Sequence, residues 1–148
     1  MFLRHPLLSV ATFAYLGVVG LITLSPQSDS PEGNILWWLV EFFERHRATE
    51  WITYNGLEFF ANVMMFVPFG IFFVLLLGRR NWWLAILLGV ALTVGIEFAQ
   101  QYIPNRVSDP RDILSNSIGA TFGTLVALVL TAAKARRIRI AQLRARTT

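Results

Sequence analysis

The sequence predicts an all-α polytopic membrane protein, a four-transmembrane-helix bundle with a short interfacial helix in its first outer loop. Hydrophobic residues make up 55% of the chain and charged residues only 15%, against about 25% charged in an average globular domain. The mean hydropathy is +0.53. Four apolar stretches reach the roughly 20 residues that a helix needs to cross about 30 Å of hydrocarbon. A chain of 148 residues with these stretches forms one domain, residues 1–148, and has no room for a separate soluble one.

The four predicted spans are residues 7–24, 59–77, 82–103 and 113–133. Only the third contains a charged residue, Glu97. The first span follows Arg4, as the apolar part of a cleaved signal peptide would, but no clean small-x-small cleavage site follows it. We therefore expect an uncleaved anchor, and both interpretations send residues 25–57 to the outside.

Orientation is predicted from the Lys and Arg residues that flank the spans. With the N-terminus inside, the inner segments hold Arg4, Arg79, Arg80 and six residues of the tail, which makes nine. The outer segments then hold four, namely Arg45, Arg47, Arg106 and Arg111. The excess predicts a cell-membrane protein with both termini in the cytoplasm.

The outer loop, residues 25–57, contains a short amphipathic pattern. Large apolar residues recur at helical spacing, beside two tryptophans: Ile35, Leu36, Trp37, Trp38, Leu39, Phe42 and Phe43. Tryptophan is favoured at the membrane–water interface, so the pattern predicts a helix lying in the outer interface. A lid packed over the bundle is the alternative interpretation.

Polar side chains, which are costly inside a membrane protein, gather near the outer ends of three predicted helices. In the second span Glu58 and Asn62 are four residues apart and share a face. In the third, Glu97, Gln100 and Gln101 share a face in the last two turns. Because the topology brings these ends to the start of the fourth span, we expect one outward-facing ligand-binding site, formed by Asn62, Glu97, Gln100, Arg106, Asp109, Asp112 and Asn116.

Each of these residues also has a structural interpretation. Asp112 follows Pro110 and Arg111, and suits a first helical turn, where the helix dipole favours negative charge. Arg106 could neutralise a nearby carboxylate, and Asn62 could join helices by hydrogen bonds. Four carboxylates and two arginines at one end of the bundle favour a site over scaffolding alone.

Several kinds of chemistry are excluded or disfavoured by composition. The chain has no cysteine, which excludes disulfides and thiolate sites, and its two histidines are His5 and His46. We expect no cofactor and no metal site; Mg²⁺ at Asp109 and Asp112 is the one option kept open. The positive charge is local, because six of thirteen basic residues lie in the tail, residues 134–148. That tail is a topology determinant or a contact for anionic lipids, and nothing supports nucleic-acid binding.

Small residues in the fourth span predict close packing of helices. Gly119 and Gly123 form a G-x-x-x-G pair, which lets a neighbouring helix backbone come close. We expect this contact inside the bundle, with homodimerisation as the alternative.

Pro68, followed by Phe69 and Gly70, removes a helical hydrogen bond and predicts a kink in the second span.

Three blocks of residues resemble a known family. Between residues 58 and 125 the chain reads, in order, Asn62-x-x-x-Phe66-x-Pro68-x-Gly70, Glu97-x-x-Gln100 and Arg106-x-x-Asp109-x-x-Asp112-x-x-x-Asn116-x-x-Gly119-x-x-x-Gly123. With these blocks the chain resembles the VanZ-like family, and the Gln100-Gln101 doublet and Pro110 are its clearest departures. The resemblance implies a small multi-pass protein of the bacterial cell envelope. The family takes its name from a protein that raises resistance to the glycopeptide teicoplanin, and the name alone does not make this protein an antibiotic resistance factor.

Three functions follow, and binding is the preferred one. The site would bind an envelope lipid head group, a lipid-linked cell-wall precursor or a lipophilic glycopeptide, with Arg106 on phosphate or carboxylate. Alternatively, the protein is an enzyme acting on an envelope lipid, with Glu97 as the candidate general acid or base. The third function is an assembly protein that holds a protein partner. Whether the chain forms a homo-oligomer is left open.

Overall fold

The computed structural model describes residues 6–25, 35–44, 52–104 and 109–146, and all of its regular elements there are helices. In chain order they are α1 (Pro6–Leu24), α2 (Ile35–Glu44), α3 (Tyr54–Leu77), the short 3₁₀ helix η2 (Arg79–Asn81), α4 (Trp82–Gln100) and α5 (Pro110–Arg146). Four segments are long and apolar enough to cross a membrane: α1, α3, η2 with α4, and α5 as far as Ala133. The predicted fold class is confirmed, and the chain is a multi-pass membrane protein.

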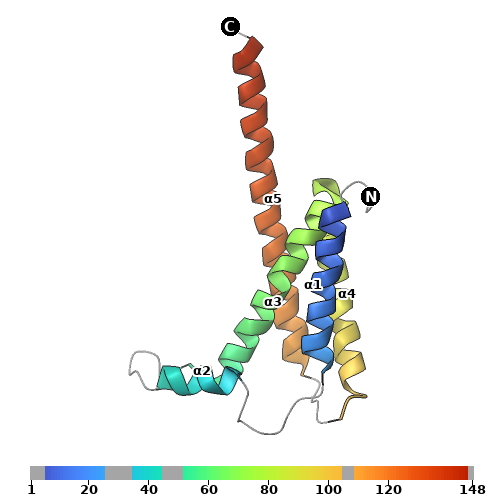
Figure 1. Ribbon diagram of the computed structural model, residues 1–148, viewed down its shortest axis with the longest axis vertical. Helices are drawn as coiled ribbons and strands as arrows, with labels where there is room; N and C mark the ends of the chain where they lie inside the picture. The colour runs from blue at the N-terminus through green and yellow to red at the C-terminus, as the bar shows by residue number, and fades with distance from the viewer. Residues whose placement is uncertain (1–5, 26–34, 45–51, 105–108, 147–148) are drawn as a thin grey trace.

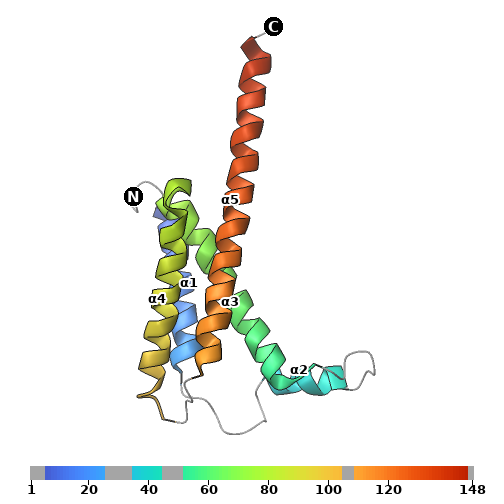
Figure 2. The ribbon, with the colours of Figure 1, turned by 180° about the vertical axis from the view of Figure 1, so that it is seen from behind.

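The spanning helices stand beside one another with their ends in two groups (Figure 1, Figure 2). One group holds the start of α1, η2 and the C-terminal part of α5, which extends well beyond the other helices. The other group holds the end of α1, the start of α3, the end of α4 and the start of α5. Because α2 lies there too, we name it the α2 end.

Helix α2 lies across the direction of the spanning helices and points away from the bundle (Figure 1). It contacts the N-terminal end of α3. Its Val40 is buried, whereas Trp38 and Phe42 are exposed and stacked, with ring centroids 5.9 Å apart. An exposed aromatic face on a helix in this position fits an interfacial helix. It does not fit a lid over the bundle.

Local capping sets the bounds of α3. The helix begins at Tyr54, before the predicted residue 59, because the Thr53 hydroxyl accepts a hydrogen bond from the Gly56 N–H at 3.2 Å. It ends at Leu77, because the next residue is Gly78, whose φ of 82° favours glycine and whose N–H donates to the Val74 carbonyl at 2.9 Å. The helix continues through Pro68 without ending there.

The third and fourth spans also differ from their predicted bounds. Helix α4 ends at Gln100 and not at residue 103, because the chain turns there and the Ile103 N–H donates to the Gln100 carbonyl at 3.0 Å. Helix α5 begins at Pro110 and continues past the predicted residue 133 to Arg146. Alanine and arginine, both strong helix formers, are frequent in this last part, and neither glycine nor proline interrupts it.

Helices α3 and α5 approach until their backbones touch. A Cβ added at Gly123 would lie 1.9 Å from the Val67 carbonyl oxygen, and one at Gly119 would lie 2.1 Å from that of Val63. Gly70 of α3 makes the reciprocal contact with the backbone of α5. No larger residue fits at these positions without moving a helix, so the glycines allow the close crossing. The G-x-x-x-G pair thus lies inside this bundle.

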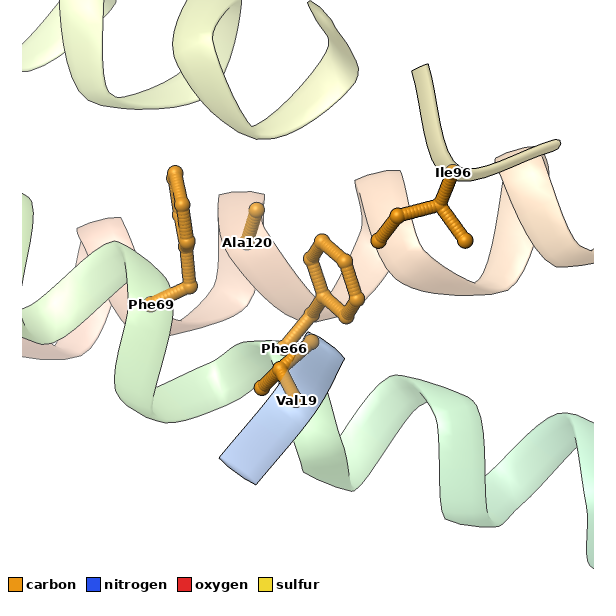
Figure 3. Close-up of a cluster of buried hydrophobic side chains, with 5 residues drawn as sticks. All are labelled: Val19, Phe66, Phe69, Ile96 and Ala120. Carbon is orange, nitrogen blue, oxygen red and sulfur yellow. The ribbon is translucent and has the colours of Figure 1, made fainter. Parts of the chain in front are cut away.

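The hydrophobic core lies where α3 meets the other three spanning helices. Phe66 is fully buried, and its ring stacks near that of Phe69 at 5.9 Å. Side chains from all four helices complete this cluster, which Figure 3 shows as Val19, Phe66, Phe69, Ile96 and Ala120. The core therefore fixes how α3 and α5 stand relative to α1 and α4, and so positions the polar residues at their ends.

Candidate functional site

Polar side chains from α3, α4 and α5 meet at the α2 end, and one hydrogen bond joins α3 to α5. Asn62 lies two turns into α3, and its Nδ2 donates to Oδ1 of Asp112 on α5 at 2.8 Å. Both side chains are half-buried. The Ser115 hydroxyl also donates to the Asp112 backbone carbonyl, at 3.1 Å. The Asn62–Asp112 bond thereby holds the first turn of α5 against α3, whereas the Ser115 bond lies within α5.

A second hydrogen bond joins α5 to α4, one turn deeper in the bundle. Asn116 follows Asp112 by four residues, and its Nδ2 donates to the Thr93 hydroxyl at 2.9 Å. Thr93 in turn precedes Glu97 by four residues on α4. Since residues four apart lie one above the other on a helix, the Asn116–Thr93 bond lies directly beneath the two carboxylates. Glu97 itself is only 4% exposed.

Gln100 connects α4 to α1. Its Nε2 donates to the backbone carbonyl of Thr23 at 2.9 Å, in a buried position. A backbone carbonyl only accepts hydrogen bonds, so the amide NH₂ must point to α1 and the amide oxygen must point away from that contact. We name Asn62, Glu97, Gln100, Asp112 and Asn116 the polar cluster.

Of the remaining candidates, Asp109 and Arg106, the structure describes only Asp109, which directly precedes α5. Asp109 caps that helix, because its Oδ1 accepts from the Arg111 N–H at 2.9 Å and its backbone carbonyl accepts from the Asp112 N–H at 2.8 Å. The Arg111 guanidinium also lies 3.5 Å from the other carboxylate oxygen of Asp109. Arg106 lies outside the residues that the structure describes.

Three other carboxylates lie near Asp112, and one of them, that of Asp109, is paired with Arg111. The carboxylates of Glu97, Glu58 and Asp109 all act on the Asp112 carboxylate through space. Glu58, one turn before Asn62 on α3, thus belongs to the surroundings of the polar cluster. Among the described side chains, no three His, Asp or Glu residues stand close enough together to hold a metal ion.

Two amide oxygens of the polar cluster, those of Gln100 and Asn116, are buried without a hydrogen-bond donor among the described residues. Gln100 is 4% exposed and Asn116 is 3% exposed. Neither amide oxygen has a hydrogen-bond partner among the residues that the structure describes. Each of the three amides of the cluster gives one N–H to a neighbouring helix, and the oxygens of Gln100 and Asn116 remain as acceptors.

The partners supplied by α1 and by Thr93 were missed in the sequence. Ser9, Thr12 and Thr23 of α1 are buried, and the Tyr15 hydroxyl of α1 donates to the Met65 carbonyl of α3. A signal existed in the sequence, because the polar residues Ser9, Thr12 and Thr23 stand at helical spacing in an otherwise apolar span. Thr93 had the same kind of signal, four residues before Glu97.

Comparison with known proteins agrees with this architecture. No curated protein and no solved structure matches the chain. The family model VanZ/LLP1 matches residues 12–131. The match extends beyond the motif-bearing residues 58–125 to include most of α1, whose side chains supply contacts to α3 and α4. Because the model covers most of the sequence, the chain belongs to the VanZ/LLP1 family.

Proposed function

We propose that this VanZ/LLP1 protein is a membrane recognition protein whose polar cluster binds the head group of an envelope lipid or of a lipid-linked cell-wall precursor. The observation that carries the proposal is the burial of Glu97 on α4 beside the half-buried Asp112 on α5. Carboxylates within membrane-spanning segments are costly and usually serve a function.

Scaffolding accounts for the amides better than for the carboxylates. The amide groups of Asn62, Gln100 and Asn116 each donate to a neighbouring helix. Holding the helices does not require charge at Asp112, because the oxygen of an asparagine there would accept the same hydrogen bond from Asn62. The charge itself therefore supports a role in binding.

The position of α2 supports a lipid head group as the ligand. A helix lying across the spans with exposed Trp38 and Phe42 is suited to the membrane interface. The polar cluster lies at the same end of the bundle as α2, which corresponds to the depth of lipid head groups. A ligand anchored in the bilayer would thus present its head group at the level of Asp112.

The proposal includes a side of the membrane and a role for Arg106. The nine-to-four distribution of basic residues favours placing the α2 end outside and both termini in the cytoplasm. On that side the polar cluster would be accessible to lipid-linked wall precursors and to glycopeptides such as teicoplanin. By its place in the sequence, Arg106 is the proposed contact for a phosphate or carboxylate of the ligand.

The experiment is native mass spectrometry of the gently extracted protein. We would compare the wild type with Glu97→Gln and Asp112→Asn, which remove charge while preserving shape. Glu41→Gln on the exposed surface of α2 makes the same chemical change away from the cluster. A co-purifying lipid is expected in the wild type and in the control, and it should fall about tenfold in both cluster variants.

Other outcomes would reject the proposal. Equal lipid retention in all four proteins would identify the lipid as a non-specific annulus. A protein partner bound in every sample, with no lipid, would favour an assembly role. Conversion of the retained lipid to a product would point to an enzyme, with Glu97 as its candidate acid or base.

A further inference from the structure

We propose that the end of the bundle opposite the α2 end binds anionic phospholipids through a basic collar, which consists of Arg79 and Arg80 of η2 and Arg136 of α5. The inference concerns a surface away from the polar cluster and does not depend on what the cluster binds. Two observations carry it: the separation of charge between the two ends of the bundle, and the continuation of α5 beyond its apolar part as a basic helix.

Acidic and basic residues lie at opposite ends of the bundle. The nine acidic residues all fall within residues 29–112, and none of them within residues 59–96. Those that the structure describes stand on α2, at the start of α3, at the end of α4 and around the start of α5, all at the α2 end (Figure 1). Arg79, Arg80 and Arg136 are exposed at the other end, away from every described acidic residue. A bound counter-charge would therefore have to come from outside the chain.

Helix geometry brings Arg136 to the depth of lipid phosphates. The apolar part of α5 ends at Ala133, and Arg136 follows about 5 Å later along the helix axis. The head-group layer on each side of a bilayer is about 5–8 Å thick. Arg144 and Arg146 stand about 17 Å and 20 Å beyond Ala133, which is past this layer and about two Debye lengths away at physiological salt. Only the first basic residues of this part of α5 are thus within reach of the phosphates.

The short helix η2 adds two arginines at the same end of the bundle. Arg79 and Arg80 lie just before Trp82 and Trp83, which are 42% and 52% exposed at the start of α4. Exposed tryptophan is favoured at the membrane–water interface, so this pair indicates where the interface crosses α4. In the proposed orientation this end faces the cytoplasm, where the membrane surface is negative.

The basic part of α5 has no acidic residue of its own to balance its charge. Residues 134–146 contain six basic residues and no acidic one. Lys134 and Arg137 are three residues apart, as are Arg136 and Arg139, and like charges at this spacing are neighbours that destabilise a helix. Lipid phosphates beside the first turn would relieve this repulsion, and arginine can hold a phosphate with two parallel hydrogen bonds. A zwitterionic lipid brings an ammonium with each phosphate, so an anionic lipid suits the collar better.

The test uses purified full-length protein in vesicles of phosphatidylglycerol and phosphatidylcholine, mixed in equal amounts and with identical acyl chains. Because both leaflets have the same composition, the orientation of the protein does not affect the result. After gentle extraction, native mass spectrometry should show phosphatidylglycerol retained about tenfold over phosphatidylcholine. The expected size follows because each basic residue near an anionic surface raises affinity about fivefold.

Two double variants with the same loss of charge separate the collar from the distal part of α5. Arg79→Gln combined with Arg80→Gln should lower the preference at least about fivefold, and Arg136→Gln alone should also lower it. Arg144→Gln combined with Arg146→Gln should leave the preference within about twofold of the wild type, because these residues stand beyond the head groups. The melting temperature of each variant would verify that the bundle is intact.

Four outcomes would overturn the inference. The first is equal retention of the two lipids by the wild type. The second is an equal fall in the two double variants, because positive charge would then act wherever it stands on the protein. The third is a preference that survives in the collar variants and is lost in Asp112→Asn, which would place the anionic lipid at the polar cluster. The fourth is release of phosphatidylglycerol by single-stranded RNA at the same phosphate concentration, which would make a nucleic acid the partner.

Discussion

Asn62 of α3 donates a hydrogen bond to the Asp112 carboxylate of α5 across 2.8 Å, although fifty residues separate them in the chain. The bond crosses between the two helices that make the closest backbone contact in the bundle, at the level where the polar cluster begins. Asp112 therefore contributes to the fold through this bond, and a role in ligand binding is proposed for the same residue. The two roles can be separated, because Asp112→Asn keeps the acceptor and removes the charge.

The first prediction concerns the energy of this bond. A double-mutant cycle with Asn62→Ala and Asp112→Ala should give a coupling of at least about 0.6 kcal/mol, the average for hydrogen bonds between membrane helices, for which the largest values are about 1.7 kcal/mol. Reversible unfolding in mixed micelles measures it. A cycle with Asn55→Ala, an exposed asparagine of α3, in place of Asn62→Ala should give no coupling. Equal coupling in the two cycles would contradict a specific bond.

A second prediction follows from the contact between α3 and α5. Gly123→Ala places a methyl group where the Val67 carbonyl oxygen stands, and should destabilise the bundle by about 1–3 kcal/mol through overpacking. Gly95→Ala on α4 is the matched control, since a Cβ there meets nothing within 4 Å. Unfolding in micelles should separate the two variants. Equal stability would show that the helices separate at little cost.

A third prediction concerns the hydroxyl of Tyr15, which donates to the Met65 carbonyl close to Pro68. Tyr15→Phe keeps the ring, which packs edge-on against Phe72 at 5.5 Å, and removes only the hydrogen bond. A loss of about 1 kcal/mol in unfolding free energy is expected. Tyr102→Phe, at a ring that is 73% exposed, should change stability little. If both variants lose the same amount, the bond between α1 and α3 contributes nothing.

The spans were predictable because hydropathy depends on composition over about 20 residues, and all four predicted spans match helices. Their ends were less predictable, because they depend on single groups such as the Thr53 hydroxyl and the Asp109 carboxylate. Asp112 was recognised as a residue of the first turn, but the capping residue is Asp109. Continuation of α5 to Arg146 was not foreseen, since a charged tail carries no hydropathy signal.

The location of the polar cluster was predictable, but the hydrogen-bond partners within it were not. Topology alone brings the start of α3, the end of α4 and the start of α5 together. Which atoms meet depends on helix rotation and on side-chain conformation, which periodicity leaves open. The pairing of Asn116 with Thr93, and of Gln100 with the Thr23 carbonyl, therefore required the structure. The roles of these residues in ligand binding stay predictions.

The last prediction concerns the side of the membrane on which the cluster lies. Because the chain has no cysteine, Tyr102→Cys and Arg80→Cys each create a sole thiol, exposed at opposite ends of the bundle. In intact cells an impermeant maleimide should label residue 102 and leave residue 80 unlabelled until the membrane is opened, because basic residues favour the cytoplasmic side. The reverse pattern would place the polar cluster on the cytoplasmic side and exclude extracellular glycopeptides as its ligands. Labelling of both thiols from outside would contradict a membrane crossing between them.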